Sequence, residues 1–288
     1  MREVNARVLQ RGVTLRGGFG MEWEVNQLLF ADDTALVADS EIKLQRLVEE
    51  FGRVCKNRRL KVNIDKSKVL KCSKEGVYGD MDVKLNGENL EEVQSFRYLG
   101  VDVAADGTME TEILHRTGEG AKMLGAMRGM WRNRTVSRQA KVGMFEGIVA
   151  PAVLYGSECW TLNVRERRRV DVLEMRCLRA ITGVRWFDRV RNDRVREMCG
   201  INRSFSERAE QSQLKWYGHL ERMEEERMVK RIYRSEVGGA RARGRPRKRW
   251  KDGIREALSN RGLDIQEGER RARERDRWNE VVYGRGDA

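Results

Sequence analysis

The stretch "LLFADDTAL", residues 28–36, places two adjacent aspartates, Asp32 and Asp33, between two apolar runs. An apolar–turn–apolar pattern is typical of a β-hairpin, in which aspartates only occupy a tight turn. This turn has no Gly or Asn, however, and adjacent carboxylates repel each other unless a cation pairs with them. Mg²⁺ is a usual partner, because it is held by one or two carboxylates together with substrate phosphates. A structural turn and a metal site therefore both fit these nine residues.

The chain has 288 residues and a net charge of +13, with 36% charged residues and only two prolines. This composition favours a helix-rich soluble protein. The charge is uneven: residues 1–110 hold 17 Lys/Arg and 19 Asp/Glu, a net −2, whereas residues 111–288 hold 41 and 26, a net +15. Such asymmetry predicts a polyanionic partner for the second part, although a solvated helical surface has a similar composition.

Several absences bear on the expected location. The N-terminus "MREVNARVLQRG" lacks the apolar core of a signal peptide, and "GIVAPAVLYG", residues 147–156, is too short to span a bilayer. The five cysteines are far apart and only two histidines occur, so neither a zinc site nor a disulfide framework is expected. We expect an intracellular protein, nuclear or cytoplasmic, that is neither secreted nor membrane-bound.

Up to about residue 105 the pattern predicts short strands and one helix, an α+β fold. The expected elements are strands at 24–30 and 34–38, a helix over 40–57 capped by Asp39 or Ser40, strand–turn–strand at 60–72, a hairpin at Asn86-Gly87 and a strand at 96–103.

From about residue 108 the apolar spacing becomes helical. Helices are expected over 108–131, 137–150, 164–181, 193–201, 206–223 and 252–260, with Ser137 capping the second and Pro151 beyond its end. The helix 164–181 should bury one apolar face and expose arginines on the other. Its predicted buried face is Val170, Leu173, Cys177, Leu178 and Ile181.

This order of motifs resembles the palm of a reverse transcriptase, and most closely the non-LTR (LINE-type) retrotransposon class. "FADD", residues 30–33, resembles the catalytic metal-binding hairpin of that family. "LKVNIDKSK", residues 60–68, resembles the segment that brings a lysine near the incoming nucleotide, and "FRYLG", residues 96–100, resembles the turn that grips the primer. Downstream, "YGSECWTL", "RCLRAITGVRW", "LKWYGHLERM" and "GRPRKRWKD" are similar to the thumb and C-terminal region of the same elements.

The resemblance implies roles for individual residues. Asp32 would be a ligand, and Asp33 a weaker ligand or electrostatic support, in a two-metal Mg²⁺ site. Lys66, or alternatively Lys61, would lie near the leaving pyrophosphate on a loop supported by Asn63; a solvated turn lysine is the alternative. The other implied positions are Ala31 beside the primer terminus, Phe30 packed beneath the hairpin, and Tyr98, Leu99 and Gly100 at the primer grip.

The family also needs a metal-binding aspartate upstream, whereas no Asp precedes Asp32 here. The fingers, the nucleotide-selecting helix and an endonuclease domain are absent from these residues too. We therefore expect a C-terminal fragment of a longer RNA-directed DNA polymerase, inactive alone. Its expected parts are a partial palm over 1–107, a helical thumb-like region over 108–235, and a basic linker with a C-terminal helix over 236–288. The expected partner is an RNA template with a DNA primer, or duplex nucleic acid.

The run "GRPRKRW", residues 244–250, lies in a basic stretch that includes Arg243, Arg245, Arg247, Lys248 and Arg249. Arg243-Gly244-Arg245-Pro246 resembles an AT-hook, in which arginines enter the minor groove of A·T-rich DNA. A nuclear localisation signal and a plain basic linker are the alternatives. The run supports a second possible function, a nucleic-acid-binding module without catalysis. A third possibility is a degraded reading frame with no selected function.

Overall fold

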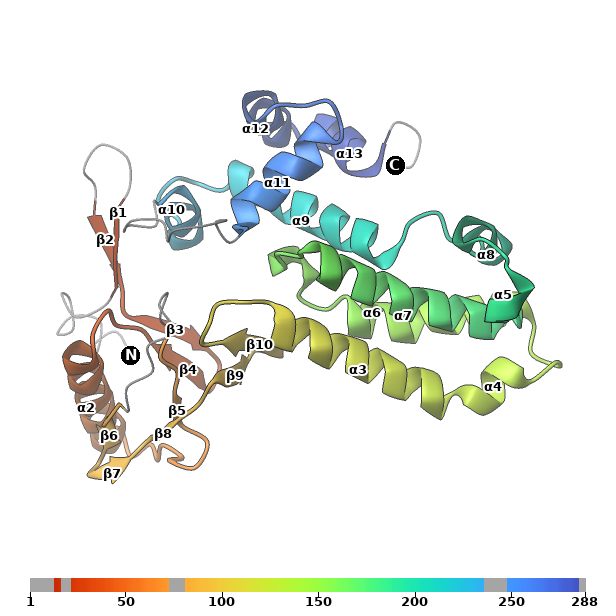
Figure 1. The fold of residues 1–288 in the computed structure, drawn as a ribbon. Coiled ribbons are helices and arrows are strands. Elements are labelled where there is room, and N and C mark those ends of the chain that lie inside the picture. The colour runs from red at the N-terminus through yellow and green to blue at the C-terminus, as the bar shows by residue number, and fades with distance from the viewer. Residues whose placement is uncertain (1–12, 17–21, 73–80, 236–247, 285–288) are drawn as a thin grey trace. The chain divides into compact units, whose positions relative to one another are not determined.

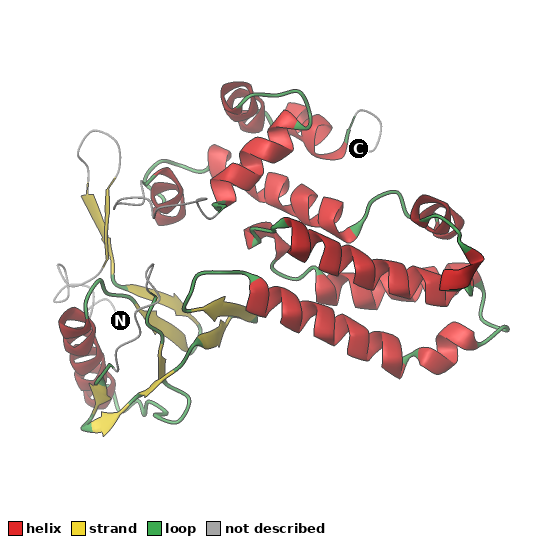
Figure 2. Ribbon diagram, viewed as in Figure 1, coloured by secondary structure: helices red, strands yellow, loops and turns green. Residues whose placement is uncertain are grey.

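The computed structural model describes residues 13–16, 22–72, 81–235 and 248–284, and the chain divides into two compact units (Figure 1). One comprises residues 1–108 and 224–243, and the other residues 109–223 and 244–288. Figure 2 shows the strands in the first unit and helices throughout the described part of the second, which confirms the predicted α+β class. Residues 244–288, which the sequence analysis placed in a separate segment, group by their contacts with the helical region. None of the described helices is both long and apolar enough to cross a membrane.

The strands of the first unit form two-stranded pairs rather than one continuous sheet. Four pairs are antiparallel: β1 (Val13–Arg16) with β2 (Glu22–Val25), β3 (Gln27–Phe30) with β4 (Asp33–Leu36), β6 (Lys84–Leu85) with β7 (Glu88–Asn89), and β9 (Ser95–Tyr98) with β10 (Val101–Ala104). The fifth pair, β5 (Lys68–Val69) with β8 (Glu91–Glu92), is parallel. The residue pattern predicts the β3–β4 and β6–β7 hairpins but not the β1–β2 pair.

Helix α2 (Glu41–Asn57) covers the small apolar core of this unit, as its predicted amphipathic pattern requires. Val48 of the helix packs with Val69, Val83 and Leu85. Gln45 fixes the helix to β6, because its side-chain amide accepts from the Lys84 backbone N–H (2.7 Å) and donates to the Lys84 carbonyl (3.0 Å). The first unit also contains the short helix α10 (Met228–Arg234).

Two predicted strands of this unit are wrong. The segment 96–103 is a hairpin, because Leu99 and Gly100 both have positive φ (49° and 79°) and form a two-residue turn. Residues 60–63 are not in a strand. After α2, Arg59 adopts the left-handed region (φ 58°), and Leu60 donates its N–H back to the Cys55 carbonyl (2.8 Å). At each of these turns a residue with a long side chain, Leu99 or Arg59, adopts positive φ. Such residues rarely adopt this conformation.

The second unit consists of helices, and one large apolar core lies among those between Ile113 and Ala209. The helices are α3 (Glu110–Ala126), α4 (Arg128–Arg132), α5 (Arg138–Met144), α6 (Ala150–Val153), α7 (Val164–Thr182), α8 (Asn192–Cys199), α9 (Phe205–Arg222), α11 (Trp250–Ser259), α12 (Ile265–Arg273) and α13 (Arg275–Tyr283). All five residues of the predicted apolar face of α7 are buried, which confirms that prediction. Helices α12 and α13 were not predicted.

The chain between α5 and α6 departs from the prediction that Pro151 lies beyond a helix end. A π-helical segment, Phe145–Val149, joins the two helices, and Pro151 lies in the first turn of α6. Proline has no N–H to donate, and the first turn and a π-bulge both tolerate that loss. The helix predicted over 108–131 is also interrupted, because α3 ends at Ala126. Beyond this break, the Trp131 indole N–H donates to the Leu124 carbonyl in the last turn of α3 (3.1 Å).

Gly218 in α9 lies directly against the Trp278 side chain of α13. A Cβ atom there would lie 2.1 Å from Nε1 of Trp278, an indole that is only 2% exposed and donates to the Leu214 carbonyl (2.9 Å). We expect Gly218→Ala to lower the free energy of unfolding in urea by about 1–3 kcal/mol, because the ring must move within a packed core. Gly125→Ala in α3, where nothing lies within 4 Å, should stabilise by up to about 1 kcal/mol. Equal losses in both variants would contradict this packing.

Candidate catalytic hairpin and nucleic-acid interface

The two aspartates lie at the tip of the β3–β4 hairpin. Phe30 pairs with Asp33, so Ala31 and Asp32 form the turn between the strands. Ala31, Asp32 and Asp33 are all exposed, which confirms the predicted position of the carboxylates. Ala31 has φ of 50°, a left-handed conformation that is unfavourable for a residue with a Cβ. Backbone strain of this kind often marks functional sites.

The prediction that Phe30 packs beneath this hairpin is wrong. Its side chain is 62% exposed, and Leu28, on the same face of β3, is 42% exposed. The β3–β4 sheet has only two strands within the described ranges, so this face stays open to solvent.

The lysine candidate lies on a separate turn. Residues 64–66 form the turn, and the Lys66 N–H donates to Oδ1 of Asn63 (3.1 Å). The Ser67 hydroxyl donates to the Asn63 carbonyl (2.8 Å), so Asn63 holds the loop from both its side chain and its backbone. The residues Lys61 and Lys66 are both exposed.

The turn predicted to grip a primer is the tip of the β9–β10 hairpin. Leu99 and Gly100 are exposed there, and Tyr98 is half-buried. Arg97 on β9 pairs across the hairpin with Asp102 on β10, with both N···O distances at 3.2 Å. The cross-strand pair stabilises the hairpin that presents the turn.

The candidate residues thus lie on three separate turns of the first unit. At the β3–β4 tip, Asp32 and Asp33 supply the oxygen donors that fit one Mg²⁺ ion, whose other positions would be filled by water or phosphate oxygens. The described ranges contain no group of three or more His, Cys, Asp and Glu side chains that could hold a metal.

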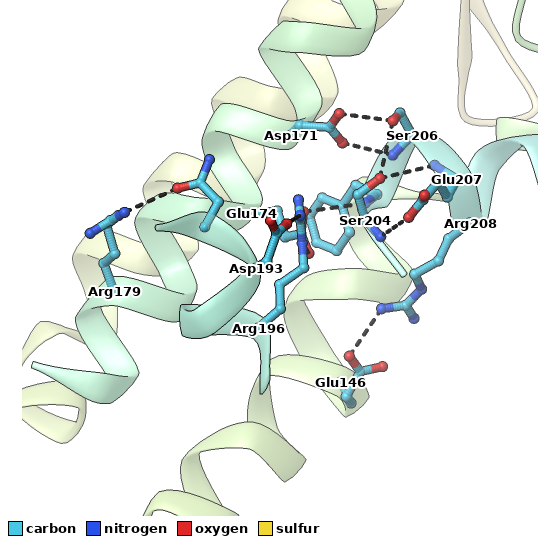
Figure 3. A network of polar contacts seen from close by, with 12 residues as sticks. Glu146, Asp171, Glu174, Arg179, Asp193, Arg196, Ser204, Ser206, Glu207 and Arg208 are labelled. Carbon is cyan, nitrogen blue, oxygen red and sulfur yellow. Dashed lines mark hydrogen bonds and ion pairs between the residues drawn. The ribbon is translucent and has the colours of Figure 1, made fainter. Parts of the chain in front are cut away.

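In the second unit a polar network joins α7, α8 and α9 (Figure 3). Glu174 of α7 is fully buried, and Arg196 of α8 donates to both of its oxygens (3.2 and 3.0 Å). Burial raises the pKa of Glu174 above its usual value, against the opposing effect of Arg196. Asp171 accepts from the backbone N–H (2.9 Å) and the hydroxyl (2.8 Å) of Ser206 in the first turn of α9. These contacts fix the three helices together.

The basic run is only partly described. The residues Arg243, Arg245 and Arg247 lie outside the described ranges. Lys248 forms an ion pair with Glu256, and its hydrogen bond is the main cause that lowers the pKa of that carboxyl. The Arg249 N–H donates to Asp252 (2.9 Å) at the start of α11. Both described residues thus take part in the beginning of that helix.

The sequence analysis missed an exposed aromatic pair between α7 and α8. Trp186 is 85% exposed and Phe187 54% exposed, with ring centroids 5.8 Å apart in an edge-to-face arrangement. The guanidinium of Arg185 lies over the Phe187 ring, 5.6 Å from its centroid. The signal was the pattern "RWFDRVR", residues 185–191, in which two adjacent aromatics are flanked by arginines.

Comparison with known proteins finds a family match over the segment that contains the hairpin. Residues 2–103 match the family model of reverse transcriptase (RNA-dependent DNA polymerase). Over these residues the chain is similar to reverse transcriptases. The hairpin with Asp32 and Asp33 and the turns at 64–66 and 99–100 all lie in the matched range.

Two relatives come from animals. A Caenorhabditis elegans protein named as transposon-derived is 27% identical over 271 residues, which are 90% of this chain and 95% of that protein. A Drosophila melanogaster protein named as an RNA-directed DNA polymerase from transposon BS is 26% identical over 170 residues, which are 56% of this chain and 19% of that protein. No solved structure matches the chain. Both relatives are thus named as products of transposons.

Proposed function

We propose that this chain is the acidic-hairpin and thumb part of a non-LTR retrotransposon reverse transcriptase, that it binds nucleic acid, and that these 288 residues alone do not polymerise DNA. One observation carries the proposal: the β3–β4 hairpin presents Asp32 and Asp33 on an exposed, strained turn inside the segment that matches the reverse transcriptase family. Such a turn can reach metal ions and a primer end, because no described side chain buries it.

Asp32 and Asp33 would hold Mg²⁺ on this hairpin. When bound, the ion stabilises charge on the transferring phosphoryl group. Ala31, next to the carboxylates, leaves room for a primer terminus because its side chain is a single methyl group. Lys66, exposed on the loop that Asn63 fixes, offers a positive charge to a triphosphate.

The proposed loss of activity rests on the carboxylate count. Residues 1–31 contain no aspartate. Within these 288 residues, Asp32 and Asp33 therefore have no aspartate upstream to complete the catalytic set. Catalytic groups that act as a unit commonly lose several orders of magnitude in rate when one is removed. We expect no primer extension by the purified chain on a primed RNA template, with Mg²⁺ or Mn²⁺, in a gel assay with a labelled primer.

The control is the same protein carrying Asp32→Ala. If the unmodified chain extends the primer and Asp32→Ala abolishes the extension, the hairpin is catalytic without an upstream aspartate and the inactivity proposal is wrong. Extension that survives Asp32→Ala would point to a contaminating polymerase and leaves the hairpin inactive, as proposed.

We propose that nucleic-acid binding resides chiefly in residues 111–288, whose net charge is +15 against −2 for residues 1–110. Arginine and lysine contacts to phosphate position a protein on nucleic acid without reading bases. Binding should therefore be largely independent of sequence. An AT-hook at Arg243-Gly244-Arg245-Pro246 would instead add a preference for A·T-rich duplexes.

A further inference from the structure

The acidic residues of α7 all form contacts within the second unit. The helix contains six arginines and three acidic residues, Glu166, Asp171 and Glu174. All three acids are engaged within the unit: Glu166 accepts from the Asn163 N–H (2.7 Å) at the N-cap, Asp171 holds Ser206, and Glu174 holds Arg196. The acids of α7 are therefore not available to neutralise its outer face.

Two of the six arginines are also engaged. The guanidinium of Arg167 forms an ion pair with the Glu210 carboxylate (N···O 3.7 Å). Arg179 donates to the Val190 carbonyl (2.8 Å) and to the Asn192 side-chain oxygen (3.0 Å). The other four are exposed and have no ion-pair partner within the described ranges: Arg165, Arg168, Arg169 and Arg176.

These four arginines form one stripe, because at about 100° per residue they fall on one side of the helix. Val172, which is 50% exposed, lies among them. At about 1.5 Å rise per residue the stripe is roughly 16 Å long. We call it the α7 arginine stripe.

The stripe leads into the loop that carries the aromatic pair. Gly183 ends α7 in the left-handed conformation, and Trp186 and Phe187 follow on a short 3₁₀ turn. The segment 183–191 holds three arginines and one aspartate. An indole that is 85% exposed beside this charge is a large apolar surface with no covering group in the described structure.

We propose that the α7 arginine stripe and the Trp186–Phe187 pair form a binding site for single-stranded nucleic acid. The arginines would contact successive phosphates, and the exposed rings would stack on unpaired bases. A duplex suits the rings poorly, because its bases are already stacked on each other. The inference deepens the proposed function, on which it rests, by placing the single strand at one named face.

The test of the rings measures fluorescence anisotropy with labelled oligo(dT), oligo(rU) and a mixed-sequence duplex of equal length. An aromatic side chain can stack on any base, and substitution of that side chain by alanine removes the stacking. We expect Trp186→Ala to weaken binding to both single strands by about tenfold and duplex binding by much less. Trp186→Phe, which keeps an aromatic ring, should retain most of the affinity. The DNA and RNA probes distinguish the two sources of single strand.

The test of the stripe compares two variants with the same decrease in positive charge. One changes Arg165, Arg168, Arg169 and Arg176 to Gln. The control changes four exposed arginines that pair with acids within one helical turn, namely Arg194, Arg255, Arg270 and Arg277, to Gln. The slope of log affinity against log salt on single strands should fall by about 0.7 for each phosphate that the variant no longer neutralises. We expect a clear fall for the stripe variant and a small one for the control.

Each outcome decides the inference. Wild-type binding that neither the ring variants nor the stripe variant changes would overturn the site but leave nucleic-acid binding elsewhere on the chain. Equal effects of the stripe and control variants would show that only total charge matters, which also overturns it. No binding of the wild type to any probe would overturn both the site and the proposed function. Thermal melting of each variant near the wild-type temperature confirms that the fold is intact.

Discussion

Raising the salt concentration from 50 to 200 mM should weaken nucleic-acid binding by about a thousandfold, if roughly six phosphates are contacted. The effect arises because each phosphate neutralised by Lys or Arg releases about 0.9 counterion from duplex DNA. The +15 carried by residues 111–288 is large enough for such a set of contacts. Equilibrium titrations over a series of salt concentrations, on a mixed-sequence and an A·T-rich duplex, give the slope.

The basic run can be separated from the helices by changing Arg241, Arg243, Arg245 and Arg247 to Gln. Lys248 and Arg249 stay unchanged, because both take part in the start of α11. We expect a shallower salt slope and weaker binding to both duplexes. Loss confined to the A·T-rich duplex would favour an AT-hook, and an unchanged slope would place binding on the helices alone.

Arg196→Met should strongly destabilise the second unit. It leaves Glu174 fully buried without the guanidinium that donates to both its oxygens, and removing one partner of a buried pair typically costs about 3–5 kcal/mol. Urea unfolding at neutral pH measures the loss. Adding Glu174→Gln to Arg196→Met removes the buried charge and should recover most of it. A double variant as unstable as Arg196→Met alone would contradict this explanation.

The decrease in the free energy of unfolding caused by Arg196→Met should also depend on pH. Burial raises the pKa of Glu174, so the folded protein binds a proton at this site more readily than the unfolded chain does. The penalty is therefore present above the folded-state pKa and is relieved as the pH falls through it. Without Arg196 the folded-state pKa of Glu174 rises further. The difference in free energy of unfolding between Arg196→Met and the wild type should therefore decrease on mild acidification.

Local signals in the sequence predicted part of this fold. Asn86-Gly87 predicted its hairpin because both residues accept positive φ (54° and 89°). The apolar spacing of 164–181 predicted α7 and its buried face. The turn at Leu99-Gly100 was missed because leucine rarely adopts positive φ, so the residue types favoured a strand.

The site was less predictable, because its properties depend on distant partners. The sequence placed Asp32 and Asp33 on a turn but could not show that Phe30 is exposed, since burial depends on which strands pair with β3. The composition of α7 showed many arginines but not which of them are neutralised. Glu174 finds its partner in Arg196, 22 residues away, and Asp171 finds Ser206, 35 residues away.

The residues of the chain that contact nucleic acid can be mapped directly. Ultraviolet crosslinking to an RNA that carries 4-thiouridine, followed by mass spectrometry, identifies the crosslinked peptides. We expect most crosslinks to fall in residues 111–288, to include the Trp186–Phe187 loop, and to disappear as the salt concentration is raised. Crosslinks confined to residues 1–110, or a pattern insensitive to salt, would contradict this expectation.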